Sequence, residues 1–252
     1  MAEDMRIEDY LAQGGKLTSP LNVPPRYRAE LMKLMATFVD SELAGSAGFA
    51  DIVNEAPGIK ERIAAARIVL EKTDSAERVL RIMGEFGVDT DRYATHHPWT
   101  ARLARGADIG AVRSEHDMRL AVFNYPIQGW TDAVVMNLLM SNAVVEQLAE
   151  FSSISYQPLA EAFREIAPIE EHHGELALEG AIKLVAQGET ETMQNSVDYW
   201  WPHVAASFGS GNVEKTENLR KMGLRHKSGP ELKRSWTKKA SDLLDQLGLT
   251  KP

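Results

Sequence analysis

Residues 169–175 read Ile-Glu-Glu-His-His-Gly-Glu and place Glu170 and His173 three positions apart. Residues i and i+3 share one face of an α-helix, so this carboxylate and this imidazole can hold one metal ion together. The face that carries them is otherwise apolar and includes Phe163, Ile166, Ala177 and Leu184. A charged group on such a face needs a partner, because an unpaired buried charge is costly. The segment therefore predicts a core helix with a metal or a hydrogen-bonded pair at its centre.

A spacing of 29 residues occurs twice along the chain. It separates Ser141 from Glu170, and it separates Glu42 from Glu71, with Asp74 three positions further on. In four-helix bundles that hold two metal ions, one helix of each antiparallel pair gives a Glu and its partner gives Glu-x-x-His. The doubled spacing predicts such a bundle. Asp74 would then stand in place of the first histidine, and Ser141 in place of one carboxylate.

Apolar residues that recur at intervals of three and four predict five helices. We expect them at about residues 26–45 or beyond, 59–86, 131–152 and 158–188, and around 199–202. We expect a loose arm before residue 22, and short helices and loop over residues 92–117, where we do not expect His96 and His97 to be ligands. No useful strand-like alternation occurs, so the predicted class is all-α.

Composition narrows the possible functions. The chain has 252 residues, of which 44% are hydrophobic and 25% are charged, as in ordinary globular proteins. It has no cysteine, which leaves histidine and carboxylates as the strong metal ligands. The net charge of −8 disfavours a nucleic-acid partner. We expect no membrane span and no secretion signal, and therefore a cytoplasmic protein.

The second metal half-site has an alternative explanation. Arg67 lies one turn before Glu71 and Arg78 one turn after Asp74, so ion pairs at i,i+4 can satisfy both acids. An arginine that reached inward would also neutralise the acids on the facing helices and replace iron by an internal salt-bridge network. A single metal ion or manganese is a further option.

Several motifs give the chain a family resemblance. In order, they are Asp40-Ser41-Glu42-Leu43-Ala44-Gly45, Phe123-Asn124-Tyr125-Pro126, Ser155-Tyr156-x-Pro158, Glu170-x-x-His173 and Trp200-Trp201-Pro202. From Pro24 to the C-terminal tail the chain resembles the phenylacetate-catabolism family, and within it the catalytic subunit of the ring-1,2-phenylacetyl-CoA epoxidases.

The resemblance implies a ferritin-like four-helix bundle over residues 22–210, with residues 211–252 as a basic helical extension of the same domain. It implies a di-iron monooxygenase (oxidoreductase) that epoxidises an aromatic acyl-CoA, and its expected partners in a homo- or hetero-oligomer are a reductase and a related metal-free subunit. Carried over to this chain, it makes Glu42, Glu71, Glu170 and His173 iron ligands, with Asp74 at the position of the family's histidine. Of these, Glu42, Glu170 and His173 are the expected catalytic residues.

Two functional hypotheses follow. In the first, the chain is the oxygenase subunit, whose acids hold iron. In the second, it is a metal-free subunit that keeps the bundle for assembly or for binding acyl-CoA. Residues 215–239, with nine Lys or Arg against two Glu, either contact the phosphates of CoA or an acidic partner, or form a solvated helical surface.

Overall fold

The structure is a computed structural model that describes residues 7–109, 117–209 and 211–252. Within these ranges the chain forms α-helices and short 3-10 helices and no strand, and an isolated parallel bridge joins Leu17 to Tyr156. The long helices are α2 (Pro25–Ile52), α3 (Ile59–Glu85), α5 (Trp130–Phe151), α6 (Gln157–Ala186), α7 (Thr190–Ala206) and α9 (Gly229–Gln246). The shorter ones are α1 (Ile7–Ala12), η1 (Pro20–Asn22), η2 (Val53–Glu55), α4 (Thr90–His96), η4 (Ala121–Asn124) and α8 (Val213–Lys221).

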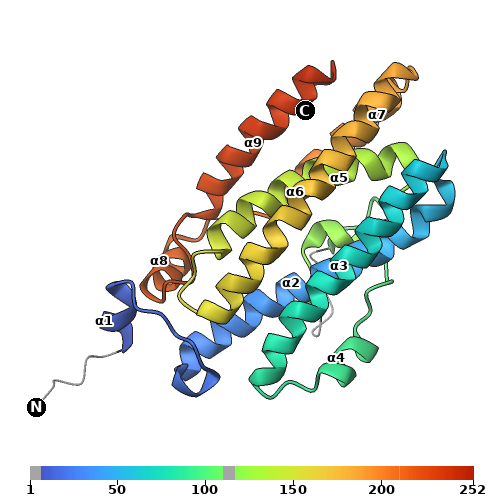
Figure 1. Cartoon of the computed structure of the whole chain (residues 1–252). Coiled ribbons are helices and arrows are strands. Elements are labelled where there is room, and N and C mark those ends of the chain that lie inside the picture. The colour runs from blue at the N-terminus through green and yellow to red at the C-terminus, as the bar shows by residue number, and fades with distance from the viewer. Residues whose placement is uncertain (1–6, 110–116, 210) are drawn as a thin grey trace, which may run out of the picture.

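Four of these helices form the bundle. Helix α2 packs along α3 and α5 packs along α6, and the two pairs meet through contacts of α3 with α6 and of α2 with α5 (Figure 1). Helices α7 and α9 pack against α5 from outside. This arrangement confirms the all-α, ferritin-like fold with additional C-terminal helices.

The helix boundaries follow local chemistry. Pro25 and Pro158 lie in the first turns of α2 and α6, where backbone N–H groups have no intrahelical partner. Gly87 ends the turn after α3 with a φ of 87°, and Gly129 precedes α5 with a φ of 88°, conformations that favour glycine. The predicted core helices therefore end within a few residues of their predicted bounds, except that α2 continues past Gly45 to Ile52.

The expectation of a loose N-terminal arm was wrong for residues 7–21. Leu11 and Leu17 are buried in the main core. The backbone N–H of Leu17 donates to the carbonyl of Ser155 at 2.8 Å, and the N–H of Gln157 donates to the carbonyl of Leu17 at 2.8 Å. The segment is held because it pairs with the connection between α5 and α6.

The C-terminal helix α9 is anchored by one large side chain. Trp236 is fully buried, and its indole N–H donates to the carbonyl of Leu139 on α5 at 3.0 Å. Its ring also lies 4.6 Å from that of Trp201 on α7, measured between centroids. The cations Lys233, Arg234 and Lys238 on the same helix are exposed.

Replacing Trp236 by alanine should lower the free energy of unfolding by about 3–5 kcal/mol, because the change leaves a cavity and removes the indole hydrogen bond. Urea denaturation measures the loss. Lys233→Ala, an exposed change on the same helix, is the control and should shift the stability by less than about 0.5 kcal/mol. Equal effects of the two variants would mean that α9 is not anchored through Trp236.

Candidate functional site

The centre of the bundle holds a cluster of charged side chains around a lysine. Lys72 on α3 lies between Glu42 on α2 and Glu170 on α6, and all three are buried. The Lys72 Nζ atom is 2.8 Å from Glu170 Oε1 and 3.3 Å from Glu42 Oε2. It therefore donates strongly to one carboxylate and weakly to the other. Three helices are tied together by one ammonium group.

His173 extends this cluster toward the surface. Its ring is fully buried, with Nε2 2.8 Å from Glu71 Oε2 and Nδ1 3.3 Å from Glu170 Oε1. Glu71, on α3, is half-buried and is the outermost residue of the cluster. Both ring nitrogens of His173 thus face carboxylates.

The electrostatics of the cluster separate the two core acids. Burial raises the pKa of Glu42 to about 8, although Lys72 opposes the shift. Burial also disfavours the charged form of Glu170, but Lys72 and His173 outweigh it and hold the pKa of Glu170 at about 2. The pKa of Lys72 is raised, because its two carboxylate partners outweigh the effect of burial. The cluster therefore favours the ionised form of Glu170 and the protonated form of Glu42.

The structure corrects the predicted register of α3. Lys72, which lies 30 residues after Glu42, points into the bundle, and Ser75, one turn further on, is also buried. Asp74 is exposed and does not enter the cluster. The inward pair on this helix is Lys72 and Ser75, whereas the spacing of 29 had selected Glu71 and Asp74. The buried stripe of α3 contained the signal, because it runs through Ala65, Ile68, Lys72, Ala76 and Val79.

The predicted inward role of arginine was also wrong. The side chain of Arg78 is 43% exposed and pairs with Glu165 on α6, at the surface of the bundle. Arg67 is exposed as well. The internal cation is Lys72, which the sequence interpretation missed.

Ser141 reaches the core as expected. It is buried on α5, and its Oγ has no hydrogen-bond partner among the described residues. Gly174, the neighbour of His173, is close to it, because a Cβ built on this glycine would lie 3.0 Å from Ser141 Oγ. The Oγ of Ser75 is likewise buried and unpaired within the described ranges. Direct contacts join Glu42, Lys72, Glu170, His173 and Glu71, and Ser141 packs against Gly174.

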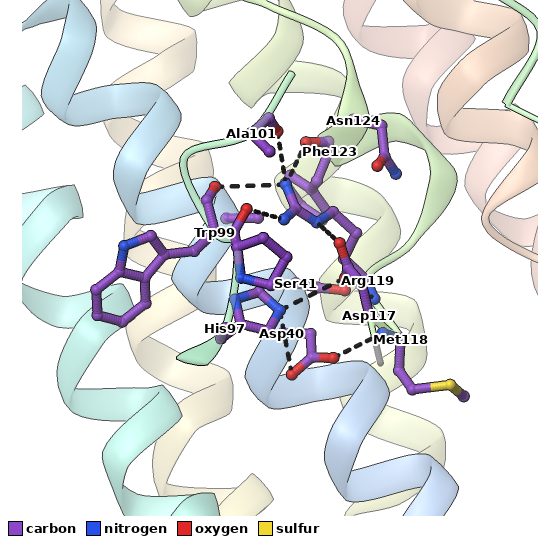
Figure 2. A network of polar contacts seen from close by, with 12 residues as sticks. Asp40, Ser41, His97, Trp99, Ala101, Asp117, Met118, Arg119, Phe123 and Asn124 are labelled. Carbon is purple, nitrogen blue, oxygen red and sulfur yellow. Dashed lines mark hydrogen bonds and ion pairs between the residues drawn. The ribbon is translucent and has the colours of Figure 1, made fainter. Parts of the chain in front are cut away.

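A second polar network begins at Asp40, which flanks Ser41 on α2 opposite to Glu42. Asp40 and Asp117 each lie 3.4 Å from His97 Nε2 (Figure 2). Asp40 also accepts from the hydroxyl of Tyr93 and, at 2.7 Å, from the backbone N–H of Met118. Sequence reasoning missed this group, because its members are distant in the chain and no local motif joins them.

Arg119 completes this network. It is buried, and its Nε lies 2.7 Å from Asp117 Oδ2. Its guanidinium also donates to the backbone carbonyls of Pro98 and Ala101 (Figure 2). Two aspartates face one arginine and one histidine, so the group is neutral when His97 is protonated.

Between these networks a cavity of about 440 Å³ opens from the surface. The polar residues that α2 contributes to its lining are Glu30, Lys33, Thr37, Ser41 and Glu42. Its apolar and aromatic lining includes Phe38, Phe123, Met140, Val144, Leu148 and Phe151. Lys33 and Lys215, both exposed, and the half-buried Arg225 also line it.

Comparison with known proteins identifies the family. Residues 15–252 match the model of the phenylacetic acid catabolic proteins. The chain belongs to this family. One component of the 1,2-phenylacetyl-CoA epoxidase of Escherichia coli K12 is a relative that is 23% identical over 258 residues, which cover 100% of this chain and 78% of that protein. These findings confirm the resemblance seen in the motifs. None of the helices in the described ranges is long and apolar enough to cross a membrane.

The di-iron centre implied by the resemblance does not fit the residues of the core cluster. Lys72 puts a positive charge between Glu42 and Glu170, where a metal cation would be repelled. Ser75 and Ser141 offer neutral hydroxyls, whereas such centres are held by carboxylates and imidazoles. His173 Nε2 is already hydrogen-bonded to Glu71, while Nδ1, 3.3 Å from Glu170, makes no hydrogen bond within the described residues. We therefore assign no reaction step to iron in this chain.

Within the described part of the chain, three potential metal ligands lie close together. They are Asp40, His97 and Asp117, and one ligand atom of each lies within 4.8 Å of the others. Hydrogen bonds to Asp40 and the guanidinium on Asp117 already satisfy these acids. We interpret this group as an ion-pair network.

The raised pKa of His97 predicts a pH dependence of the free energy of unfolding. Burial lowers the pKa of His97, but Asp117 and Asp40 outweigh burial, so the folded-state pKa lies above the usual histidine value of 6.5. The contribution of the protonated ring is fully present below the unfolded-state pKa of about 6.5 and is lost as the pH rises through the folded-state pKa. The free energy of unfolding of the wild type should therefore fall relative to His97→Gln between about pH 6 and pH 9, by about 1 kcal/mol.

Urea denaturation at the two pH values measures this difference. His96→Gln is the matched control, because His96 is the exposed neighbour on the same turn. A difference between wild type and His97→Gln that stays constant with pH would show that the histidine is neutral in the fold.

Proposed function

We propose that the chain is an epoxidase-like subunit in phenylacetate catabolism that binds an aromatic acyl-CoA in the cavity beside Glu42. The main support for this proposal is the lining of the cavity. It combines aromatic and aliphatic walls with a polar interior and three cationic side chains. The relative from Escherichia coli is named as part of a phenylacetyl-CoA epoxidase, which supports the same substrate class here.

The lining suits the two ends of an aromatic acyl-CoA. An aromatic ring gains free energy when it leaves water for an apolar pocket, and aromatic walls such as Phe38 and Phe123 add favourable ring contacts. Lys33 and Lys215 offer charges to the phosphates of CoA. Lys33 pairs with Glu30 at 2.9 Å, but an exposed ion pair of this kind is weak and exchanges readily for a phosphate.

The polar interior suits the thioester. Ser41 Oγ accepts the backbone N–H of Leu120 at 2.9 Å, and this contact leaves the hydroxyl proton of Ser41 free to donate. Burial favours the protonated form of Glu42, which carries a second O–H. Both groups are able to donate to a carbonyl oxygen.

We further propose that this subunit works in a cytoplasmic assembly with a reductase and a related subunit. Large apolar side chains remain exposed on two core helices, at Ile59, Ile63 and Leu70 of α3 and Ile182 of α6. Apolar groups exposed together are typical of surfaces that bind another protein. These residues support an oligomer.

Filling the cavity should weaken binding. Val144→Phe places a larger side chain against the apolar wall, and the dissociation constant for phenylacetyl-CoA should rise at least about tenfold, because the ring loses its space. Isothermal titration calorimetry measures it, with circular dichroism to confirm the helical fold. Val213→Phe, at an exposed valine outside the cavity lining, is the control. Unchanged affinity in folded Val144→Phe would place the ligand elsewhere.

Reversing a charge that lines the cavity should distinguish the contribution of the CoA phosphates to binding from that of the aromatic ring. Lys215→Glu should weaken phenylacetyl-CoA binding by about threefold to tenfold, since one charge interaction is lost and a repulsion is introduced. Free CoA should be affected similarly in competition measurements. Lys233→Glu on α9, an equal change of net charge outside this cavity, controls for long-range electrostatics. Equal weakening by both variants would argue against a phosphate contact at Lys215.

A further inference from the structure

The lysine at the centre of the bundle bears on the role of this subunit. Building on the proposed function, we infer that the Lys72 ammonium permanently occupies the place of a metal, so that this chain is an iron-free acyl-CoA-binding subunit. Oxygen activation in the assembly then belongs to another subunit that carries iron.

The contacts of Lys72 are those expected of an internal counter-ion. Its side chain is 5% exposed, and its Nζ reaches carboxylates from two other helices, at 2.8 Å and at 3.3–3.4 Å. A mobile surface lysine would instead keep its ammonium in water. Because the two acids belong to α2 and α6, Lys72 links both helices to α3, and its charge compensates for the buried carboxylate of Glu170.

His173 is the remaining candidate ligand, and its Nε2 atom is already engaged by Glu71. His173 holds Glu71 through Nε2 and faces Glu170 through Nδ1. A metal would have to break one of these contacts and also displace the ammonium. Ser75 and Ser141 supply no charge to offset that cost. The close approach of Ser141 to Gly174 also shows that the helices are packed tightly at this depth.

The cavity does not depend on a metal. It reaches Glu42 from the side of α2 and η4, and Lys72 is not among its lining residues. The ammonium therefore contacts Glu42 from outside the cavity lining, and the cavity stays open to a ligand. A subunit of this kind can bind an acyl-CoA while lacking the ions that would activate oxygen.

The first experiment measures metal and ligand together. Full-length protein is purified from cells supplied with iron and manganese, metal content is determined by mass spectrometry, and phenylacetyl-CoA binding is titrated with and without EDTA. We expect far less than one ion per chain and the same dissociation constant in both titrations. Stoichiometric iron in the wild type, or binding lost in EDTA, would overturn the inference.

The second experiment tests Lys72 itself. Lys72→Met should sharply destabilise the fold, because it leaves buried acids unpaired, whereas Lys60→Met, at an exposed lysine of the same helix, should not. Adding Glu170→Gln to Lys72→Met should recover part of the loss, as a double-mutant cycle measures. No coupling between the two positions would overturn the assignment of Lys72 as counter-ion.

The third experiment converts the site. Lys72→Glu with Ser75→His replaces the ammonium by a Glu-x-x-His pair on the inward face of α3 and should raise retained iron or manganese above the wild-type value. A folded variant that takes up no more metal would show that Lys72 is not what excludes it. Absence of acyl-CoA binding in a metal-free wild type would instead refute the proposed function and leave the assignment of Lys72 intact.

Discussion

A buried ammonium shared by three helices is the interaction on which the centre of this bundle depends. Glu42, Lys72 and Glu170 come from α2, α3 and α6, and none of them reaches water to any useful extent. An acid or a lysine left alone at this depth would lose its charge or open the fold. The pairing at 2.8 Å between Lys72 and Glu170 therefore fixes the relative depth of α3 and α6 more strictly than apolar packing alone, which tolerates small shifts.

Three consecutive residues of α2 connect this cluster to the rest of the site. Successive residues of a helix point about 100° apart, so Asp40, Ser41 and Glu42 face different neighbours. Asp40 faces His97 and the backbone of Met118, Ser41 accepts the N–H of Leu120, and Glu42 faces Lys72. One turn of α2 thus binds the backbone of the segment before η4 on one side and the charged cluster on the other. The cavity lies where these two sets of contacts meet, with Ser41 and Glu42 in its lining.

The sequence predicted the fold and the inward faces of α2, α5 and α6, because apolar periodicity and the Glu170–His173 spacing are local properties of a helix. It did not predict the register of α3. The connection between α2 and α3 sets which residue faces Glu42, and one residue of difference turns a helix face by about 100°. Asp74 and Arg78 were placed inward from their neighbours in sequence, whereas Arg78 finds its partner, Glu165, on another helix. His97 was not predicted for a similar reason, since Asp40 and Asp117 approach it only in the folded chain.

The protonation of Glu42 links the cluster to ligand binding. The charge of Lys72 is largely matched by Glu170, which lies closer to it and has the lower pKa. Glu42, whose pKa is raised by burial, is the member that borders the cavity. A neutral carboxyl can donate a hydrogen bond to a carbonyl, while an ionised one would repel it. The cluster therefore has two effects: its ammonium compensates for the buried carboxylate of Glu170, and burial favours the protonated form of Glu42, a donor beside the apolar walls where an acyl group would lie.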